Sequence, residues 1–194
     1  MNAADHPPSW QARLINLLVR ARMRPHAHKP IDPGFVRAHI GQPRSVRRLM
    51  FRASGARAQR ILSDAARPAG DWVVGRNSTD ASPVILYLHG GGYIACSPET
   101  HRPLVGSLTT RLNARAFVPA YRLAPENPYP AALDDAVASY RFLLEQHRIE
   151  PSRIIIAGDS AGGGLALATA MRIRDEALPQ PSAILLFSPW TDMA

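Results

Sequence analysis

The sequence is poor in cysteine, in lysine and in long apolar runs. A single cysteine, Cys96, excludes an intrachain disulfide and a cysteine-based metal cluster, and it favours a reducing compartment, so we expect a cytoplasmic protein. No uninterrupted apolar stretch follows a basic N-terminus, which argues against a signal peptide and against integral membrane association. Lys29 is the only lysine, so arginine carries almost all of the positive charge.

The positive charge is concentrated near the N-terminus. The formal net charge is +8, and residues 1–70 hold 13 basic and 3 acidic residues. The arginines are scattered, and no aromatic residues alternate with them to stack on bases, so we expect no nucleic-acid partner. Metal-ligand spacing is also lacking, and the sequence implies neither a metal nor another cofactor.

Residues 9–24 carry apolar side chains at helical spacing. Trp10, Leu14 and Leu17 fall on one face with arginines opposite, which predicts an amphipathic helix that ends at the proline-containing stretch 25–33. We expect this helix to cover an apolar surface of its own protein. An interaction arm for a membrane or an acidic partner, recognisable by strong salt dependence, is the weaker alternative.

The rest of the sequence alternates between short apolar runs and helical segments. Val46 to Arg52 and Trp72 to Arg76 have β-type composition and predict two outer strands. Four further runs are uniformly apolar, as expected of strands buried on both faces, and the segments between them suit crossover helices. An α/β architecture with a mostly parallel, doubly wound sheet is therefore predicted. The inner strands are expected at 83–88, 116–121, 153–157 and 183–187, and the helices at 99–113, 130–147 and 161–177.

A Gly-x-Ser-x-Gly pattern runs from Gly158 to Gly162, between a predicted strand and a predicted helix. In this pattern the central Ser160 lies in a strained turn that exposes its Oγ at a helix N-terminus. Glycines are required at both ends because a side chain there would collide with the adjacent strand or helix. A phosphate-binding turn would need Gly-x-Gly-x-x-Gly or a terminal Gly-Lys-Ser/Thr, which the segment lacks. We therefore predict that Ser160 is a catalytic nucleophile, supported by Gly158, Asp159 and Gly162.

A second glycine-rich motif follows the first inner strand, and it reads His89-Gly90-Gly91-Gly92. Glycines after a buried strand let backbone N–H groups point inward, so Gly91 and Gly92 are predicted to form an oxyanion hole with the N–H of Ala161. We expect His89 to fix the loop by hydrogen bonding rather than to transfer a proton.

These two motifs, together with Tyr121 to Glu126 and Ser188 to Asp192, resemble the hormone-sensitive-lipase-like family of α/β hydrolases over about residues 70–194. The resemblance implies hydrolysis of carboxylic esters, with a small-molecule ester or lactone as substrate. It also implies that residues 1–45 belong to a helical cap and that residues 46–194 form the N-terminal part of the hydrolase domain.

The sequence departs from the family pattern at two positions. Ala120 stands where the family usually has aspartate, which removes a possible supporting hydrogen bond, and Cys96 stands where glycine is common. In the stretch between 121 and 126 we expect Arg122 and Glu126 to tie the strand end to the following turn, which Pro125 sets.

No histidine follows Ser160, although in this fold the catalytic acid and then the histidine come after the serine. The last of the seven histidines is His147. We therefore expect an N-terminal fragment, poorly active by itself, whose sheet ends at 183–187 with an uncovered apolar edge. The alternative is a non-catalytic module that binds small molecules, or an inactive truncated product, on the same scaffold.

Overall fold

The computed structural model describes residues 9–10, 13–14, 17, 21, 32–40, 42–64 and 67–192. Contacts divide the chain into two units, Met1–Asp32 and Pro33–Ala194. The predicted helix 9–24 lies largely outside the described residues, although Trp10, Leu14 and Leu17 are helical. No helix among the described residues is long and apolar enough to cross a membrane.

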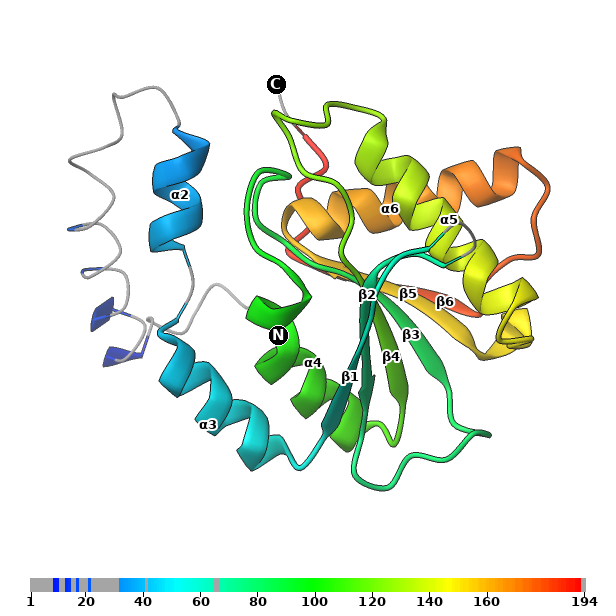
Figure 1. Ribbon diagram of the computed structural model, residues 1–194, viewed down its shortest axis with the longest axis horizontal. Coiled ribbons are helices and arrows are strands. Elements are labelled where there is room, and N and C mark those ends of the chain that lie inside the picture. Colours follow the sequence, from blue (N-terminus) through cyan, green and yellow to red (C-terminus); the bar gives the residue numbers. More distant parts are fainter. Residues whose placement is uncertain are drawn as a thin grey trace. The chain divides into compact units, whose positions relative to one another are not determined.

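Within the described part of the second unit, six strands form one sheet with helices on both faces (Figure 1). Side by side, the strands are β1 (Arg57–Ile61), β2 (Gly70–Val74), β4 (Arg115–Pro119), β3 (Val84–Leu88), β5 (Ile154–Asp159) and β6 (Ala183–Phe187). The first two run antiparallel to each other and β2 runs antiparallel to β4, whereas β4, β3, β5 and β6 are parallel. The sheet is thus mostly parallel, as predicted.

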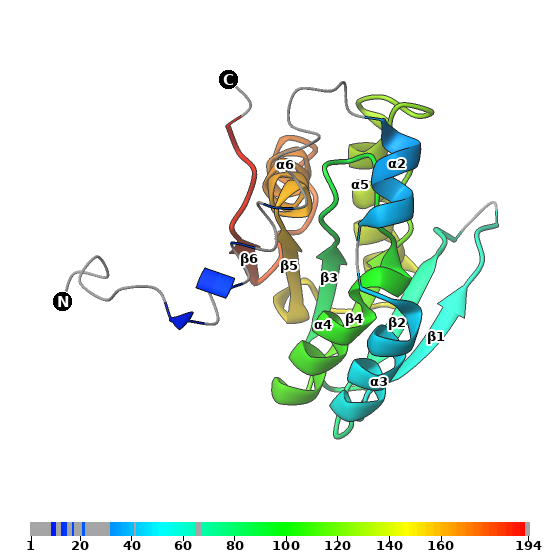
Figure 2. The ribbon, with the colours of Figure 1, turned by 90° about the vertical axis from the view of Figure 1, so that its left-hand side faces the viewer.

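The helices cover the sheet as two layers (Figure 2). One layer consists of α3 (Arg44–Ser54) and α4 (Pro98–Arg111), and the other of α5 (Ala131–Glu145) and α6 (Ala161–Asp175). A shorter helix, α2 (Pro33–His39), precedes α3 in the chain.

Strand β3 shows why the sequences of the inner strands contain continuous apolar runs. Val84, Leu86 and Leu88 belong to the core that α5 and α6 cover, whereas Ile85 and Tyr87 belong to the core beneath α4. All five residues are fully buried. A strand covered on both faces needs an apolar side chain at every position, which removes the alternation of a half-exposed strand.

The connections reverse direction between β3 and β5. Helix α4 leads from β3 outward to β4, and α5 then carries the chain back past β3 to β5. The neighbouring strands β3 and β5 therefore continue in opposite directions, into α4 on one face and into α6 on the other. Ligands of doubly wound sheets bind at such a reversal, beyond the carboxyl ends of the strands.

The four apolar strands and the three crossover helices lie within about two residues of their predicted bounds. The predicted burial of 183–187 on both faces is wrong, because β6 lies at the edge of the described sheet and its five residues are exposed. The predicted strand from Trp72 to Arg76 is β2, displaced by two residues. The predicted strand from Val46 to Arg52 is wrong, because this segment lies inside α3. Its apolar residues recur at helical spacing, and the helix packs against α4 and ends at Gly55, which adopts a left-handed φ of 71°.

The close approach of α3 to α4 depends on a glycine in α4. A Cβ atom on Gly106 would lie 2.7 Å from Ser54 Oγ and 2.9 Å from the Phe51 ring. We expect Gly106→Val to push the helices apart and to lower the free energy of unfolding by about 2 kcal/mol, as overpacking typically does. Urea denaturation measures this change. Leu104→Val on the exposed side of α4 is the matched control and should cost only about 0.5 kcal/mol. Equal effects of the two variants would contradict the packing described.

Candidate active site

Ser160 occupies the sharp turn between β5 and α6. Its backbone angles, φ 52° and ψ −124°, are strained for a residue with a side chain, and the residue is exposed. Its N–H donates to the Phe187 carbonyl at 3.0 Å, and its carbonyl accepts from the Trp190 N–H at 2.8 Å. The segment after β6 therefore holds the turn in place. No side chain in the described residues hydrogen-bonds the Ser160 hydroxyl, which leaves Oγ available.

The glycines on both sides of the turn are required by close packing against β3. A Cβ on Gly158 would collide with the Gly162 carbonyl and lie 2.8 Å from the Leu88 carbonyl. A Cβ on Gly162 would collide with the carbonyls of Leu88 and His89. A side chain at either position would therefore require the backbone to move.

The triple-glycine loop leaves the end of β3 beside this turn. Gly91 has φ 128° and Gly92 has φ 63°, both in the range that favours glycine. The Gly91 carbonyl accepts from the N–H groups of Ile94 and Ala95, at 3.2 and 3.0 Å, which closes the loop. The N–H groups of Gly91 and Gly92 have no acceptor in the described chain. Ala161 is the first residue of α6, where helix geometry also leaves the N–H without an intrahelical partner.

Asp159 links the two loops. Its Oδ1 accepts from the Tyr87 hydroxyl at 2.9 Å and from the Gly90 N–H at 3.0 Å, and it lies 3.4 Å from His101 Nε2. Burial by itself would raise the pKa of Asp159, but the hydrogen bonds from His101, Tyr87 and Gly90 outweigh it and lower the pKa below its usual value. The aspartate next to Ser160 is therefore a charged anchor for the glycine loop.

His89 is almost fully buried at the base of the loop. Its Nδ1 lies 2.9 Å from the Gly90 carbonyl, so this nitrogen carries the proton and donates it. The Tyr121 hydroxyl donates to the His89 carbonyl at 2.6 Å, and the two rings stack with centroids 4.3 Å apart. These contacts agree with the predicted loop-fixing role rather than with proton transfer.

Sequence reasoning missed Arg37, which lies on α2 and contacts two loops at once. Its guanidinium donates to the Ile94 carbonyl at 2.7 Å and to the Ala124 carbonyl at 2.9 Å, and it forms two 2.7 Å hydrogen bonds with the carboxylate of Glu126. These hydrogen bonds lower the pKa of Glu126 to about 2. The pair is partly exposed, so its main effect is to orient the two loops.

Arg122 and Glu126 were both predicted to tie the end of the strand to the following turn, and only Arg122 makes such a link. Arg122 does tie the end of β4 to the next helix, because its backbone and guanidinium donate to Asp135 of α5 at 2.8 to 3.0 Å. Glu126 takes no part in this link and pairs with Arg37 instead. The motif is therefore bound at Arg122 to α5 and at Glu126 to α2.

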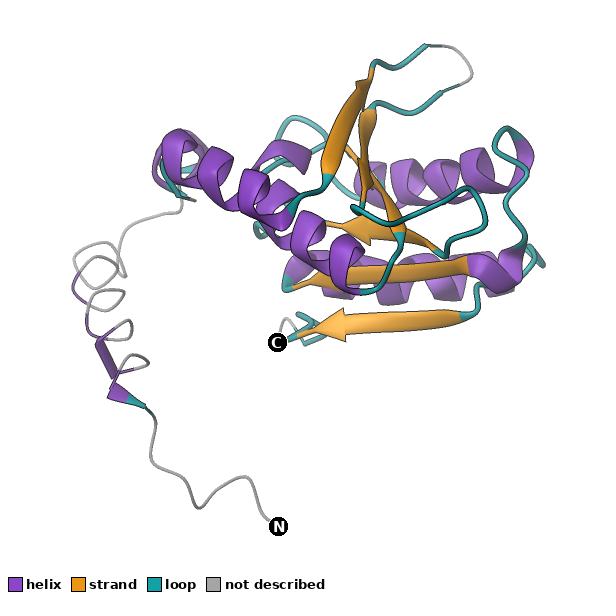
Figure 3. Cartoon of the chain, turned by 90° about the horizontal axis from the view of Figure 1, so that it is seen from below, coloured by secondary structure: helices purple, strands orange, loops and turns teal. Residues whose placement is uncertain are grey.

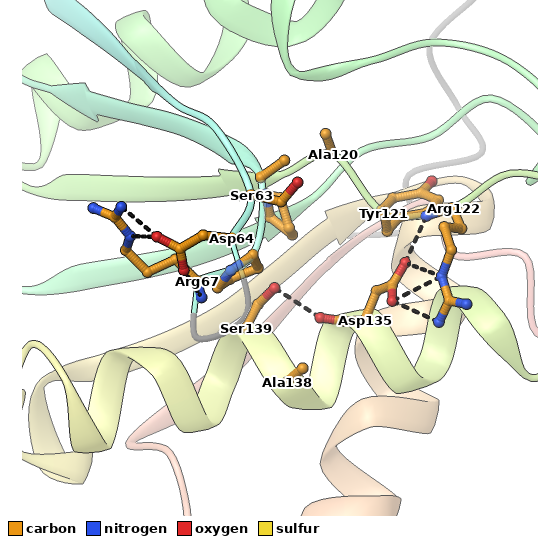
Figure 4. A pocket seen from close by; sticks show the side chains of 12 residues that line it. Ser63, Asp64, Arg67, Ala120, Tyr121, Arg122, Asp135, Ala138 and Ser139 are labelled. Atoms are coloured by element: carbon orange, nitrogen blue, oxygen red, sulfur yellow. Dashed lines mark hydrogen bonds and ion pairs between the residues drawn. The ribbon is translucent and has the colours of Figure 1, made fainter.

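A surface depression of about 400 Å³ lies beside this Arg122–Asp135 pair (Figure 4). A second ion pair, Arg67 with Asp64, lines its other side, and Ala120 lies at its rim. Both arginines already contact carboxylates, so the depression offers no free charge to a ligand. The Ala120 N–H donates to the Ala69 carbonyl at 2.9 Å.

Metal binding finds no support at the site. Among the residues that the structure describes, no three histidine, cysteine or carboxylate side chains are grouped closely enough to hold a metal ion. His101 Nε2 faces Asp159, and its Nδ1 lies 2.9 Å from the Thr100 hydroxyl.

The order of the strands and the two loops beyond β3 and β5 define the class of the protein, which is that of the α/β hydrolases. The chain belongs to the alpha/beta hydrolase fold family, whose model matches residues 85–194. The predicted resemblance to hormone-sensitive-lipase-like esterases is thereby confirmed for the N-terminal portion of that family's proteins.

Known relatives are hydrolases by name. An acetyl-hydrolase from Streptomyces hygroscopicus is 43% identical over 148 residues, which cover 71% of this chain and 48% of the relative. An esterase from Acinetobacter venetianus is 32% identical over 192 residues, covering 95% and 58%. A hormone-sensitive lipase structure from a metagenome library superposes with a TM-score of 0.73 at 34% identity, covering 97% of this chain and 60% of that one. The chain thus spans about half the length of the relatives it matches.

The buried position of His89 predicts an unusual titration. Burial lowers its pKa to about 4, so the unfolded chain binds a proton more readily than the folded one. This residue therefore stabilises the fold fully above the unfolded pKa of about 6.5, and about 3 kcal/mol is lost as the pH falls to 4. NMR of the assigned His89 ring should show no titration between pH 8 and pH 5. A midpoint near that of the urea-unfolded chain would refute the assignment.

Proposed function

We propose that this chain carries the nucleophile and the oxyanion hole of a serine carboxylic ester hydrolase. One observation carries the proposal. Ser160 is strained and exposed at the N-terminus of α6, beside a glycine loop in which the N–H groups of Gly91 and Gly92 have no acceptor among the described residues. Backbone strain of this kind persists where function requires it. A module that only binds small molecules would gain nothing from it, so the geometry favours catalysis over the alternative.

In the proposed reaction Ser160 Oγ attacks the carbonyl carbon of an ester or lactone. The carbonyl oxygen becomes an anion and accepts hydrogen bonds from the N–H groups of Gly91, Gly92 and Ala161. The positive end of the α6 dipole favours the same charge. The alcohol leaves, and water releases the acid from the acyl-enzyme. This chemistry needs no metal or other cofactor.

The general base of this reaction is proposed to come from outside the 194 residues. His89 donates its Nδ1 proton to the Gly90 carbonyl and is buried, and the Nε2 of His101 faces Asp159. Neither histidine contacts Ser160 in the structure. The fold places the catalytic acid and histidine after the serine, and the relatives extend well beyond the matched region.

Residues 1–45 are proposed to belong to a cap over the acyl pocket, with 46–194 as part of the hydrolase domain. The Arg37 contacts with the loops around Ile94 and Ala124 support this role for α2, because they connect it to the segments next to the site. The lone, half-buried Cys96 supports a cytoplasmic location.

Hydrolysis of p-nitrophenyl butyrate tests the nucleophile. We expect the version extended through the downstream histidine to turn over ester, and its Ser160→Ala variant to lose about 10⁴-fold or more in kcat. The 194-residue chain should be slower by a similar factor, because removing a triad member leaves only binding and the oxyanion hole. Ser63→Ala, an exposed serine away from the site, is the control. Full activity of the Ser160→Ala variant would end the proposal.

The two loop glycines offer a matched test of the oxyanion hole. A Cβ on Gly91 would collide with the Ala95 carbonyl, whereas a Cβ on Gly92 would meet nothing closer than an Ile94 carbon at 3.8 Å. In the extended enzyme we expect Gly91→Ala to displace its N–H and to lower kcat by about 10² to 10³. Gly92→Ala should lower kcat less, through backbone strain alone. The reverse order would show that the loop does not present its donors as proposed.

A further inference from the structure

Seven arginines of the second unit are exposed and have no carboxylate within ion-pair distance among the described residues, and six of them, all but Arg148, lie on or near α3 and α4. Most other arginines described in this unit do contact a carboxylate, as Arg37, Arg60 and Arg115 do. The uncompensated charge is therefore localised. The six residues are Arg44, Arg48 and Arg52 on α3, Arg57 at the start of β1, Arg76 after β2 and Arg111 at the end of α4.

Contacts bring Arg57, Arg76 and Arg111 close to the C-terminal end of α3. The Arg76 guanidinium lies against Gly55, which caps α3, and the Arg76 N–H donates to the Thr110 hydroxyl at 3.4 Å, next to Arg111. Arg57 pairs across the sheet with Val74, two residues before Arg76. Helices α3 and α4 lie side by side along this region (Figure 2). Arg52, Arg57, Arg76 and Arg111 thus lie near the C-terminal ends of both helices, and Arg48 and Arg44 extend the charge back along α3.

The same side of α3 exposes apolar side chains. Leu49 is 69% exposed, Met50 45% and Val46 40%. At about 100° per residue, Leu49 lies near the middle of the exposed arc, with the three α3 arginines on one side and Val46 and Met50 on the other. Phe51 and Ser54 lie on the opposite side, against Gly106 of α4.

We propose that this surface, made of the six arginines with Val46, Leu49 and Met50 and here called the α3 face, docks peripherally on an anionic lipid bilayer. A helix that presents apolar residues flanked by cations suits the boundary between lipid headgroups and acyl chains. Anionic headgroups complement the unpaired arginines. Nucleic acid would match the charge, but it would leave Leu49 without an apolar partner, and the surface has no exposed aromatic ring for stacking.

The α3 face runs along α3 from the side of Glu99, at the start of α4, to the amino ends of the parallel strands, so only its C-terminal part lies at the end of the sheet opposite Ser160. Arg57, Arg76 and Arg111 lie near the amino ends of the parallel strands, where Val74 pairs with Arg115 at the start of β4. Ser160 follows the carboxyl end of β5. The inference concerns a surface separate from Ser160 and does not depend on ester hydrolysis.

Flotation of the 194-residue chain with vesicles tests the inference. We expect binding to vesicles that contain phosphatidylglycerol, weakening with salt, and little binding to phosphatidylcholine alone. The double variant Arg48→Gln/Arg52→Gln should bind about 30-fold more weakly, at about fivefold per arginine. Leu49→Ser should bind about 10-fold more weakly because an inserted side chain is lost. Circular dichroism checks that each variant is folded.

Two exposed residues outside the α3 face serve as controls: Arg148, which also lacks a described ion pair, and Leu62, which is 76% exposed. Arg148→Gln and Leu62→Ser should bind vesicles like the parent chain. Equal losses in these controls would overturn the proposal. A parent chain that does not float with the vesicles would also overturn the proposal, and this result is expected if residues 1–32 cover the α3 face. Binding that needs the arginines but not Leu49 would identify a general polyanion site instead.

Discussion

The site depends on the close contact between the end of β3 and the turn that follows β5. The carbonyls of Leu88 and His89 lie where side chains would be if Gly158 and Gly162 were any other residue. This contact brings the glycine loop and the N-terminus of α6 together, because each follows one of the two touching strands. Without it, the serine and the loop N–H groups would belong to separate parts of the sheet edge.

Around this contact, hydrogen bonds hold the glycine loop at both of its ends. Asp159 and Tyr121 fix its beginning, through the Gly90 N–H and the His89 carbonyl. Arg37 holds its far side through the Ile94 carbonyl. The loop can therefore keep the N–H groups of Gly91 and Gly92 unpaired. In a flexible loop, such groups would turn toward another acceptor or toward water. Donors preorganised in this way need no rearrangement when negative charge develops.

The sequence predicted the parts of the fold that burial determines. Strands covered on both faces, such as β3, are apolar at every position, and the glycine motifs are fixed by steric contacts. The same composition in β6 did not mean burial, since all five of its residues are exposed. The helix at Arg44–Ser54 was missed because Val46 to Arg52 is rich in residues that also suit strands, while its partner, Gly106, lies more than 50 residues away. Strand β1 was not predicted because it is an edge strand with little burial and has a mixed composition. Arg37 could not be assigned, since its partner Glu126 is 89 residues away and no local pattern connects them.

Strand β6 has a consequence for the chain in solution. It pairs with β5 on one side, and in the described chain its other edge is open, as Figure 3 shows. All five of its residues, Ala-Ile-Leu-Leu-Phe, are exposed, and none is charged. Such a segment is a template for cross-β stacking between molecules, and Pro181 and Pro189 flank it as gatekeepers. A strand that pairs with this edge would remove the template.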